Sequence, residues 1–321
     1  KPEHHQACVL NWEIGQSIDA FPSVFKNQSF LLLQKELTPD GWRLESPAVL
    51  RLLDKLRAAG TPLGEYVNGR FYYGIKTGYN QAFVVNQETR DKLIAEHPSS
   101  QEVLKPFLRG KDVKRWCVDW AEQYLIKIES SENKKHPWSD AKTEKEAEKI
   151  FAKTYPAIYL RFECYRDRLI GRCDQGKYFW ELRSCAYWRE FEQPKIIYPD
   201  IYNHQSFTFD NNNFYLVNTC YLSSTNEVWL CGLLNSSIVE WFYSQISNKV
   251  RGGYLRAFTD YMKQIPILKA TEADKEAIEK LVQKCLDAKG VGVGEWEAEI
   301  DDRVAHLYGL TTEEMKIIRG E

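Results

Sequence analysis

The stretch Gly74-Ile75-Lys76-Thr77-Gly78-Tyr79-Asn80-Gln81-Ala82-Phe83 is the most informative part of this chain of 321 residues. Its pattern predicts a strand, a glycine turn and a second strand, forming a hairpin over Phe71–Val85. Glycines tolerate backbone angles that residues with a Cβ resist, so the turn can bend sharply beside a partner. Lys76, Thr77 and Asn80 lie on this turn and are candidates for contact with phosphates or base edges. An equally favoured alternative is a structural turn in which Thr77 and Asn80 bond their own backbone.

A second stretch, Lys105-Pro106-Phe107-Leu108-Arg109-Gly110-Lys111-Asp112-Val113-Lys114-Arg115-Trp116, places cations beside an arginine–glycine pair. Arg109, Lys111 and Arg115 are the strongest candidates for phosphate contact, because cations next to a flexible turn can follow a nucleic-acid backbone. The alternative is a solvated helix end in which Asp112 pairs with one of them. Together the two stretches predict a surface that meets phosphates and base edges.

Composition indicates a folded globular protein. Hydrophobic residues make up 43% of the chain and aromatic residues 13%, which argues against extended disorder. No apolar run approaches the length that spans a bilayer, so we expect no contact with a membrane. The first residue is lysine, from which we expect a chain cut or processed from a longer one.

Cysteine usage indicates the cellular compartment, and the charge distribution bears on nucleic-acid binding. The eight cysteines are scattered without a Cys-x-x-Cys pair, so we expect a reducing, cytoplasmic location. The net charge of −2 does not by itself predict nucleic-acid binding. Acidic residues dominate after Thr271, however, and the remainder is mildly basic. Because a local basic patch can bind DNA on a near-neutral molecule, the charge permits DNA binding without requiring it.

Periodicity and capping signals predict a mixture of helices and short strands. Ser46 and Pro47 begin one helix, and Thr311 or Thr312 caps the last one, with Glu314 in its first turn. Further helices are expected at 89–97, 101–108, 142–155, 228–246, 272–290 and 296–308. Strands are expected at 123–128, 195–199 and 264–268, with a second hairpin over 207–223.

Motifs for catalysis and metal binding are missing from the sequence. Neither Gly74–Gly78 nor Gly290–Gly294 has the spacing of a phosphate-binding loop, and no serine occupies a nucleophile elbow. Pro199-Asp200 begins like a metal-nuclease motif, but the acidic residue and lysine that should follow are absent. We therefore expect no catalytic residue, no metal ligand and no enzymatic activity in this chain by itself.

An ordered set of short motifs resembles the C-terminal specificity domain of TaqI-type adenine DNA methyltransferases. The resemblance to the same domain of fused restriction–modification enzymes is stronger still. The set continues beyond the two stretches above with Trp-Glu-Leu-Arg (180–183), Pro-Lys-Ile-Ile-Tyr-Pro-Asp-Ile (194–201), Gly-Leu-Leu-Asn-Ser (232–236), Arg-Gly-Gly-Tyr (251–254), Gln-Ile-Pro-Ile (264–267) and the closing run 300–314. The motifs occur in the family's order and cover most of the chain from Phe30 onward.

The resemblance implies a DNA target-recognition domain that follows a methyltransferase domain in the same polypeptide. Its fold would be α+β, with a central twisted sheet and hairpins plus a C-terminal helical subdomain. Residues 1–29 would lead in from the upstream domain, residues 30–269 would form the recognition domain, and residues 270–321 a helical segment.

The same resemblance implies the partners. The domain would hold double-stranded DNA and read its major groove, while the target adenine is flipped into the methyltransferase domain. That domain would bind S-adenosylmethionine, so we expect no cofactor in this chain. In some fused systems a nuclease domain precedes both.

Further candidates for DNA contact lie in the later motifs. Arg183 and Arg189 are placed to reach base edges, because arginine pairs bidentately with guanine. Salt bridges from these arginines to Glu181 or Glu190 are the alternative.

A Gly-Gly loop carries the last candidates, Arg251, Tyr254 and Arg256, and suits close approach to a DNA backbone. The alternative is a plain turn after a helix.

The sequence alone also allows a different function. The aromatic-rich stretch Tyr178–Phe191, which also carries arginines, would suit a protein-interaction module that docks onto a partner subunit. Binding to duplex DNA would distinguish the two functions.

Overall fold

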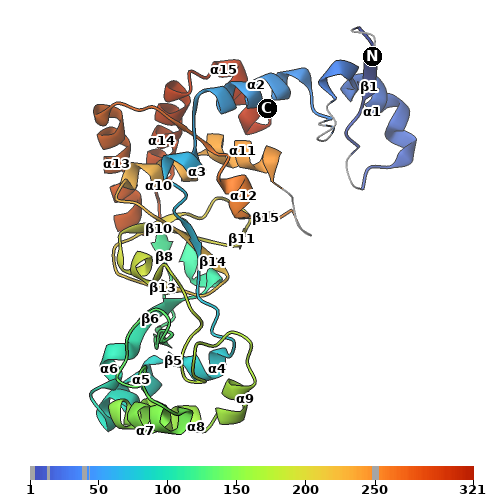
Figure 1. Ribbon diagram of the computed structural model, residues 1–321. Helices are drawn as coiled ribbons and strands as arrows, with labels where there is room; N and C mark the ends of the chain where they lie inside the picture. The colour runs from blue at the N-terminus through green and yellow to red at the C-terminus, as the bar shows by residue number, and fades with distance from the viewer. Residues whose placement is uncertain (1–3, 13–14, 38–41, 43, 248–252) are drawn as a thin grey trace.

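The computed structural model describes residues 4–12, 15–37, 42, 44–247 and 253–321 of the chain. These residues form an elongated molecule with helices at one end, a mixed lobe at the other and a sheet between them (Figure 1). A small N-terminal unit projects to one side of the helical end.

The N-terminal unit is a strand pair with one helix. Strand β1 (Gln6–Val9) pairs antiparallel with β2 (Phe30–Leu33), and α1 (Phe21–Gln28) lies between them in the sequence. The unit leaves several large apolar side chains exposed, namely Ile18, Phe21, Phe25 and Leu31.

The helical end is built around one hydrophobic cluster, called core 1 here, which includes Leu53, Leu56, Trp229 and Phe242. Its elements are α2 (Pro47–Ala58), β3 (Gly60–Pro62), α3 (Leu63–Tyr66), α10 (Val228–Asn235), α11 (Ser237–Ile246), α12 (Thr259–Met262), β16 (Pro266–Leu268), α13 (Glu272–Asp287), α14 (Gly294–Leu307) and α15 (Thr312–Arg319). Strand β16 pairs with β3, so the helices that end the chain share a core with elements that begin near residue 47.

The mixed lobe is built around a second cluster, core 2, whose largest side chains include Trp138, Phe151 and Trp180. Its sheet has the order β13 (Tyr215–Leu216), β6 (Leu104–Leu108), β9 (Gln123–Ile126), β5 (Val84–Asn86). The helices of the lobe are α4 (Asn80–Phe83), α5 (Gln87–Glu96), α6 (Ser100–Val103), α7 (Glu144–Thr154), α8 (Pro156–Glu163) and α9 (Arg166–Ile170), together with the 3-10 turn η4 (Trp188–Glu192).

A four-stranded antiparallel sheet joins the two cores. Its order is β12 (Thr208–Asp210), β10 (Lys195–Pro199), β14 (Cys220–Ser224), β4 (Phe71–Tyr73). Side chains alternate across a strand, so Ile196 and Tyr198 enter core 1 while Ile197 and Leu222 enter core 2. Two short strand pairs flank this sheet, β7 (Val113–Lys114) with β8 (Cys117–Val118), and β11 (Ile201–Tyr202) with β15 (Leu255–Arg256).

The predicted α+β class is confirmed, and so are several helix boundaries. Ser46 caps α2 by accepting the Val49 amide at 3.3 Å, and Thr311 caps α15 in a reciprocal pair with Glu314. The domain boundaries expected after residues 29 and 269 stay predictions.

Both predicted hairpins are wrong. Strands β4 and β5 belong to different sheets, and the residues between them cross from one sheet to the other. Strands β12 and β14 are separated by β10. The helix predicted over 228–246 is two helices, because Ser236 ends α10 and caps α11. The helix predicted over 101–108 is mostly strand β6.

No helix in the described part of the chain combines the length and apolar character needed to cross a bilayer.

Candidate nucleic-acid interface

The segment Gly74–Asn80 leaves the joining sheet and attaches to the lobe. The Ile75 amide donates to the Leu216 carbonyl at 2.6 Å, and the Asn218 amide donates to the Ile75 carbonyl at 3.2 Å. A Cβ at position 74 would clash with the Val217 carbonyl, so only glycine allows this approach. The glycine stretch is therefore a segment that crosses from the joining sheet to the lobe, with one isolated β-bridge between Ile75 and Val217.

The turn at Thr77 is bonded to itself, as one of the two interpretations expected. The Thr77 hydroxyl, 2% exposed, donates to Asn80 Oδ1 at 2.6 Å and accepts the Tyr79 amide at 3.1 Å. Lys76 beside it is exposed and forms no ion pair with any described residue. Contact of Thr77 and Asn80 with DNA stays a prediction, and Lys76 is the free cation of the turn.

Arg172, which the sequence analysis did not single out, holds this turn by a hydrogen bond to the Thr77 carbonyl. It is 7% exposed and donates to the carbonyls of Thr77, Phe179 and Glu181. Its guanidinium lies over the Phe83 ring, 4.4 Å from the centroid. Burial lowers the pKa of Arg172 to about 10. This value is still well above neutral pH, so the guanidinium stays charged there.

The Trp-Glu-Leu-Arg motif divides into a buried part and an exposed one. Glu181 is fully buried and accepts from the Ser131 amide at 3.0 Å and the Trp138 indole at 2.8 Å. Arg183 pairs instead with Asp174 at 3.1 Å, so the expected rival pairs with Glu181 or Glu190 are not formed. Arg183 and Lys76 line one cavity of about 100 Å³, which brings these two candidates together.

The arginine–glycine turn carries an internal ion pair. Arg109 donates through Nε and Nη2 to the Asp112 carboxylate at 3.0 and 2.9 Å, which raises the pKa of Arg109. The alternative in which Asp112 pairs with a cation is therefore observed. Lys111 is exposed and has no ion pair among the described residues, so it is the cation of this turn that is free for phosphate.

Arg115 faces the helical end. Its Nε donates to Glu297 on α14 at 2.5 Å, and its Nη1 donates to the Gln205 carbonyl at 3.2 Å. The Trp116 indole donates to the same Glu297 oxygen at 2.6 Å. Arg115 thus links the end of the second stretch to α14, and its contact with phosphate stays a prediction.

The strand pair β11–β15 presents an arginine and apolar side chains. Arg256 donates to both carboxylate oxygens of Asp200, at 3.0 and 3.4 Å, and lies over the Phe258 ring at 4.5 Å. Tyr254 and Ile201 beside it are 40% and 50% exposed. Arg251 lies outside the described residues.

A short loop that the sequence analysis missed connects these pieces. Asn218 and Thr219 are exposed between two buried strands. The Thr219 hydroxyl accepts the Gly110 amide at 3.2 Å, its carbonyl accepts the Asp200 amide at 2.9 Å, and Asn218 bonds Ile75. The loop therefore joins the Lys76 turn, the Arg109–Lys111 turn and the β11–β15 pair into one surface, called the candidate interface here.

Arg189 lies at the other end of the joining sheet. It is exposed on η4 and lines two cavities, of about 590 and 470 Å³, that contain neither Lys76 nor Arg256. The structure does not bring Arg189 to the candidate interface, and its contact with a base stays a prediction.

Comparison with known proteins decides the family. Residues 105–267 match the sequence model of the TaqI-like C-terminal specificity domain. The chain belongs to this family. The match includes the Arg109 turn, Arg183, the Asn218–Thr219 loop and Arg256, whereas Lys76 precedes it.

Relatives of this specificity domain are type II methyltransferases. The chain is 24% identical over 299 residues to the type II methyltransferase M.PaeR7I of Pseudomonas aeruginosa, covering 87% of the chain and 45% of that protein. It is 22% identical over 282 residues to M.BstVI of Geobacillus stearothermophilus, covering 87% and 46%. The chain thus spans less than half the length of these two relatives.

A solved structure shares the fold. The type IIL restriction-modification enzyme MmeI, determined in complex with DNA, superposes with a TM-score of 0.52 at 15% identity, covering 78% of this chain and 34% of that one. Within the described part of the specificity domain, no three His, Cys, Asp or Glu side chains are grouped so as to hold a metal ion.

Proposed function

We propose that this chain recognises a specific site on double-stranded DNA for a bacterial adenine DNA methyltransferase or restriction–modification enzyme. The observation that carries the proposal is the Asn218–Thr219 loop, which joins three cation-bearing segments into one surface. Membership of the specificity-domain family supports it.

The candidate interface offers two kinds of contact. Lys76 and Lys111, which have no ion pair with described residues, suit phosphates as point charges. Arg183 pairs with Asp174, and Arg256 pairs with Asp200; both arginines remain partly exposed. The guanidinium N–H groups that these pairs leave over would suit base edges. The exposed Asn218 amide would suit an adenine edge.

Methyl transfer would take place in a domain outside this chain. That domain would bind S-adenosylmethionine and receive the flipped adenine, because the reacting amino group is otherwise held inside the base stack. The chain described here would hold the duplex in register for that step.

Exposed apolar side chains support a contact between this chain and the catalytic part. Ile18, Phe21, Phe25 and Leu31 of the N-terminal unit are all more than one-third exposed, at 74%, 43%, 37% and 56%. A cluster of this kind usually marks a contact surface. We place the methyltransferase domain against it.

The alternative function, docking through the aromatic-rich stretch, is not favoured. Tyr178, Phe179, Trp180, Trp188 and Phe191 are all buried in core 2. The aromatic surface that motivated a protein-interaction module is therefore absent from this described stretch.

The test is the salt dependence of duplex binding by the double variant Lys76→Ala/Lys111→Ala. Loss of two phosphate contacts should make the negative slope of log K against log salt shallower by about 1.8. It should also weaken binding to all duplexes alike. Fluorescence anisotropy across a salt series measures the slope.

The matched control is Lys149→Ala/Lys153→Ala, which removes two exposed lysines from α7 at the far end of the lobe (Figure 1). An equal change in slope for both variants would mean that the candidate interface is placed wrongly.

A further inference from the structure

A row of polar residues crosses the joining sheet at the end opposite the candidate interface. In the strand register Asp210 lies beside Lys195, and Lys195 lies beside Ser224. Phe71 pairs with Ser223, so Arg70, the residue before it, lies level with Ser224. The row Asp210, Lys195, Ser224, Arg70 thus runs from the interior to the surface.

The inner half of the row is satisfied internally. Lys195 and Asp210 are 0% and 1% exposed and form an ion pair at 2.6 Å. Lys195 also donates to the Phe191 carbonyl at 2.7 Å, and Asp210 accepts the Asn212 amide at 2.8 Å. Neither charge of this pair is left over for a ligand.

The outer half of the row is not satisfied. Ser224 is 5% exposed, and its hydroxyl has no hydrogen-bond partner among the described residues. It borders a cavity of about 590 Å³. A buried hydroxyl without a partner is unfavourable. The hydroxyl is covered from solvent, so a ligand oxygen in this cavity would accept its hydrogen bond once the side chain rotates toward the cavity.

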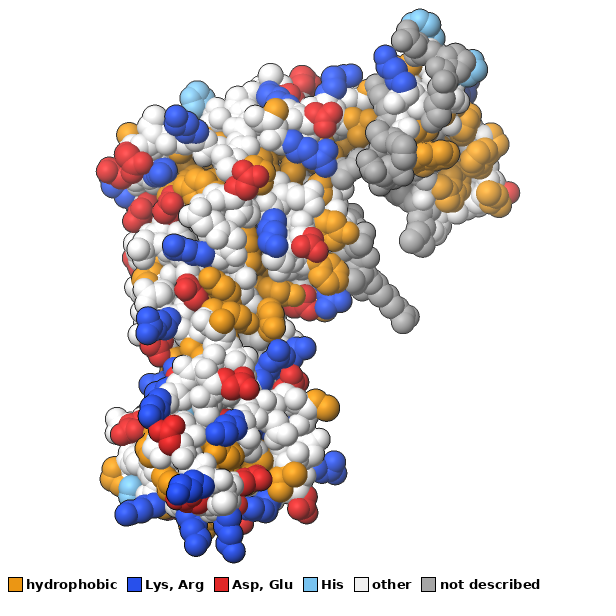
Figure 2. Space-filling model, viewed as in Figure 1, with side chains coloured by type: hydrophobic (Ala, Val, Ile, Leu, Met, Phe, Trp, Pro, Cys, Tyr) orange, Lys and Arg blue, Asp and Glu red, His pale blue; other side chains and the backbone are white. Residues whose placement is uncertain are grey.

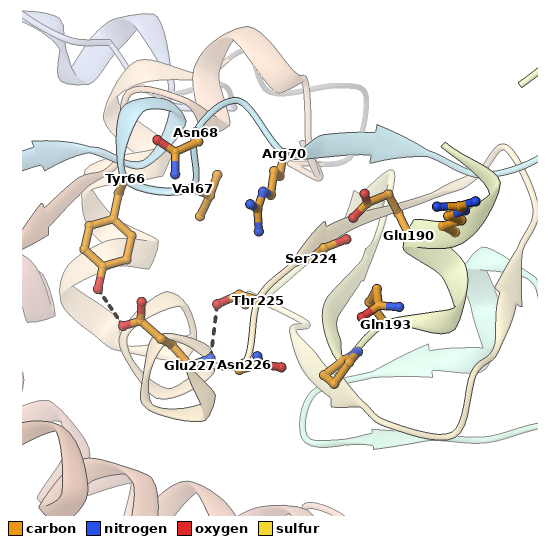
Figure 3. A pocket seen from close by; sticks show the side chains of 12 residues that line it. Tyr66, Val67, Asn68, Arg70, Glu190, Gln193, Ser224, Thr225, Asn226 and Glu227 are labelled. Carbon is orange, nitrogen blue, oxygen red and sulfur yellow. Dashed lines mark hydrogen bonds between the residues drawn. The ribbon is translucent and has the colours of Figure 1, made fainter. Parts of the chain in front are cut away.

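Two arginines border the same cavity. Arg70 and Arg189 are exposed and form no ion pair with any described residue. Figure 3 shows Arg70 on the loop just before β4 and Ser224 at the end of β14, both bordering the cavity, with Glu190 and Gln193 across from them. The amides of Asn68, Gln193 and Asn226 complete the polar lining.

The acidic residues of the cavity differ in how they are held. Glu227 accepts from the Tyr66 hydroxyl at 2.6 Å and from the Trp229 indole at 2.6 Å, and Lys275 lies 3.7 Å away. Glu227 is therefore neutralised, and Glu190 is the carboxylate that competes with an anion for the two arginines.

We propose that this cavity binds the phosphate group of a nucleotide. Guanidinium groups match phosphate geometry, the Ser224 hydroxyl would donate to a phosphate oxygen, and the three amides would meet the sugar or base. The cavity volume lies in the range of small-molecule sites. The site is separate from the candidate interface, because the strands of the sheet lie between them.

The test is calorimetric titration of the whole chain with inorganic phosphate, with deoxyadenosine monophosphate and with a short duplex. We expect Arg70→Ala/Arg189→Ala and Ser224→Ala each to weaken nucleotide binding about tenfold or more. Glu190→Gln should strengthen it, because the competing charge is removed. Arg51→Ala, an exposed arginine of α2 without an ion pair among the described residues, should leave it unchanged.

The arms of the experiment separate the sources of phosphate. Variants that weaken the mononucleotide but not the duplex identify a free nucleotide, and variants that weaken only the duplex identify the DNA backbone. Unchanged binding of all three probes in both variants, with native thermal unfolding, would overturn the proposal. Failure here leaves the candidate interface untouched, because Lys76 and Lys111 are unaltered.

Discussion

Two buried polar residues organise the lobe beside the candidate interface. Glu181 ties the Ser131 and Trp138 segment to the chain near 180, and Arg172 ties the Thr77 turn to Phe179 and Glu181. Hydrogen bonds between buried polar groups fix local geometry strongly, because water does not compete for them. Their effect is to hold Lys76 and Arg183 at one cavity.

At the same scale, we expect Arg172→Ala to lower the free energy of unfolding by about 3 kcal/mol or more. The change leaves the buried carbonyls of Thr77 and Phe179 without a donor, and each costs about 1–3 kcal/mol. The Glu181 carbonyl keeps the Gly176 amide as a donor, and the contact of the guanidinium with the Phe83 ring is also lost. Urea unfolding measures the loss. Arg183→Ala, which removes a partly exposed arginine, is the control and should cost less than about 1 kcal/mol. A loss below about 1 kcal/mol for Arg172→Ala would show that the carbonyls find other partners.

At the scale of elements, local signals predicted helix ends well. The sequence identifies Ser46 as a cap and narrows the last cap to Thr311 or Thr312, of which Thr311 caps the helix, because capping depends on residues three positions away. The two hairpins failed because their strands pair with distant partners: Gly74 approaches Val217, and β10 inserts between β12 and β14. Such pairings leave no local pattern in the sequence.

The candidate site was predictable to a similar degree. The loop motifs pointed to Lys76 and Lys111, which form no ion pair with described residues, and to Arg183 and Arg256. The sequence did not indicate that Arg183 pairs with Asp174 and Arg256 with Asp200. The local ion pair of Arg109 with Asp112 is an alternative that the sequence itself offered. The ion pair of Arg115 with Glu297, and the Asn218–Thr219 junction, come from contacts between segments far apart in the chain. The sequence signal for this junction was a polar Asn218-Thr219 pair between two apolar runs.

The Gly-Leu-Leu-Asn-Ser motif illustrates a structural role for an element. A Cβ on Gly232 would lie 2.6 Å from Val282 Cγ2 and 2.9 Å from Ile278 Cγ2, so this glycine lets α10 pack closely on α13. Asn235 exchanges two hydrogen bonds with the Phe207 backbone, at 3.0 and 2.9 Å.

We therefore expect Gly232→Ala to destabilise the protein. Overpacking costs about 1–3 kcal/mol, and the gain in helix propensity of about 1 kcal/mol offsets part of it. Thermal unfolding provides the measurement. Gly294→Ala at the start of α14, where a Cβ meets nothing within 4 Å, is the matched control and should be neutral or stabilising. Equal melting temperatures for the two variants would contradict the close packing.

At the scale of the whole molecule, the N-terminal unit stands apart from the two cores (Figure 1), and Figure 2 shows hydrophobic side chains gathered on its surface. Phe21 and Phe25 stack on each other at 5.5 Å while both remain partly exposed. We expect Phe21→Ser/Phe25→Ser to weaken binding of this chain to its methyltransferase domain supplied as a separate chain. Burying each ring is worth about 1.5–3 kcal/mol, so the loss should exceed about tenfold.

Surface plasmon resonance between the two chains makes that comparison. Leu160→Ser/Ile170→Ser removes two apolar side chains of α8 and α9 that are 64% and 50% exposed, and it should leave the affinity unchanged. If the control weakens binding and the phenylalanine variant does not, the catalytic domain contacts the lobe instead.

The joining sheet has a consequence for cooperativity. Because Tyr198 and Ile197 are neighbours on one strand yet belong to opposite cores, neither core can lose its order without exposing one face of that strand to water. The free energy of unfolding one core therefore includes the loss of contacts that belong to the other core. The helical end and the lobe should behave as a single unfolding unit. A disturbance at the cavity beside Ser224, at one end of the sheet, should therefore reach the Asn218–Thr219 loop at the other end through the same few strands.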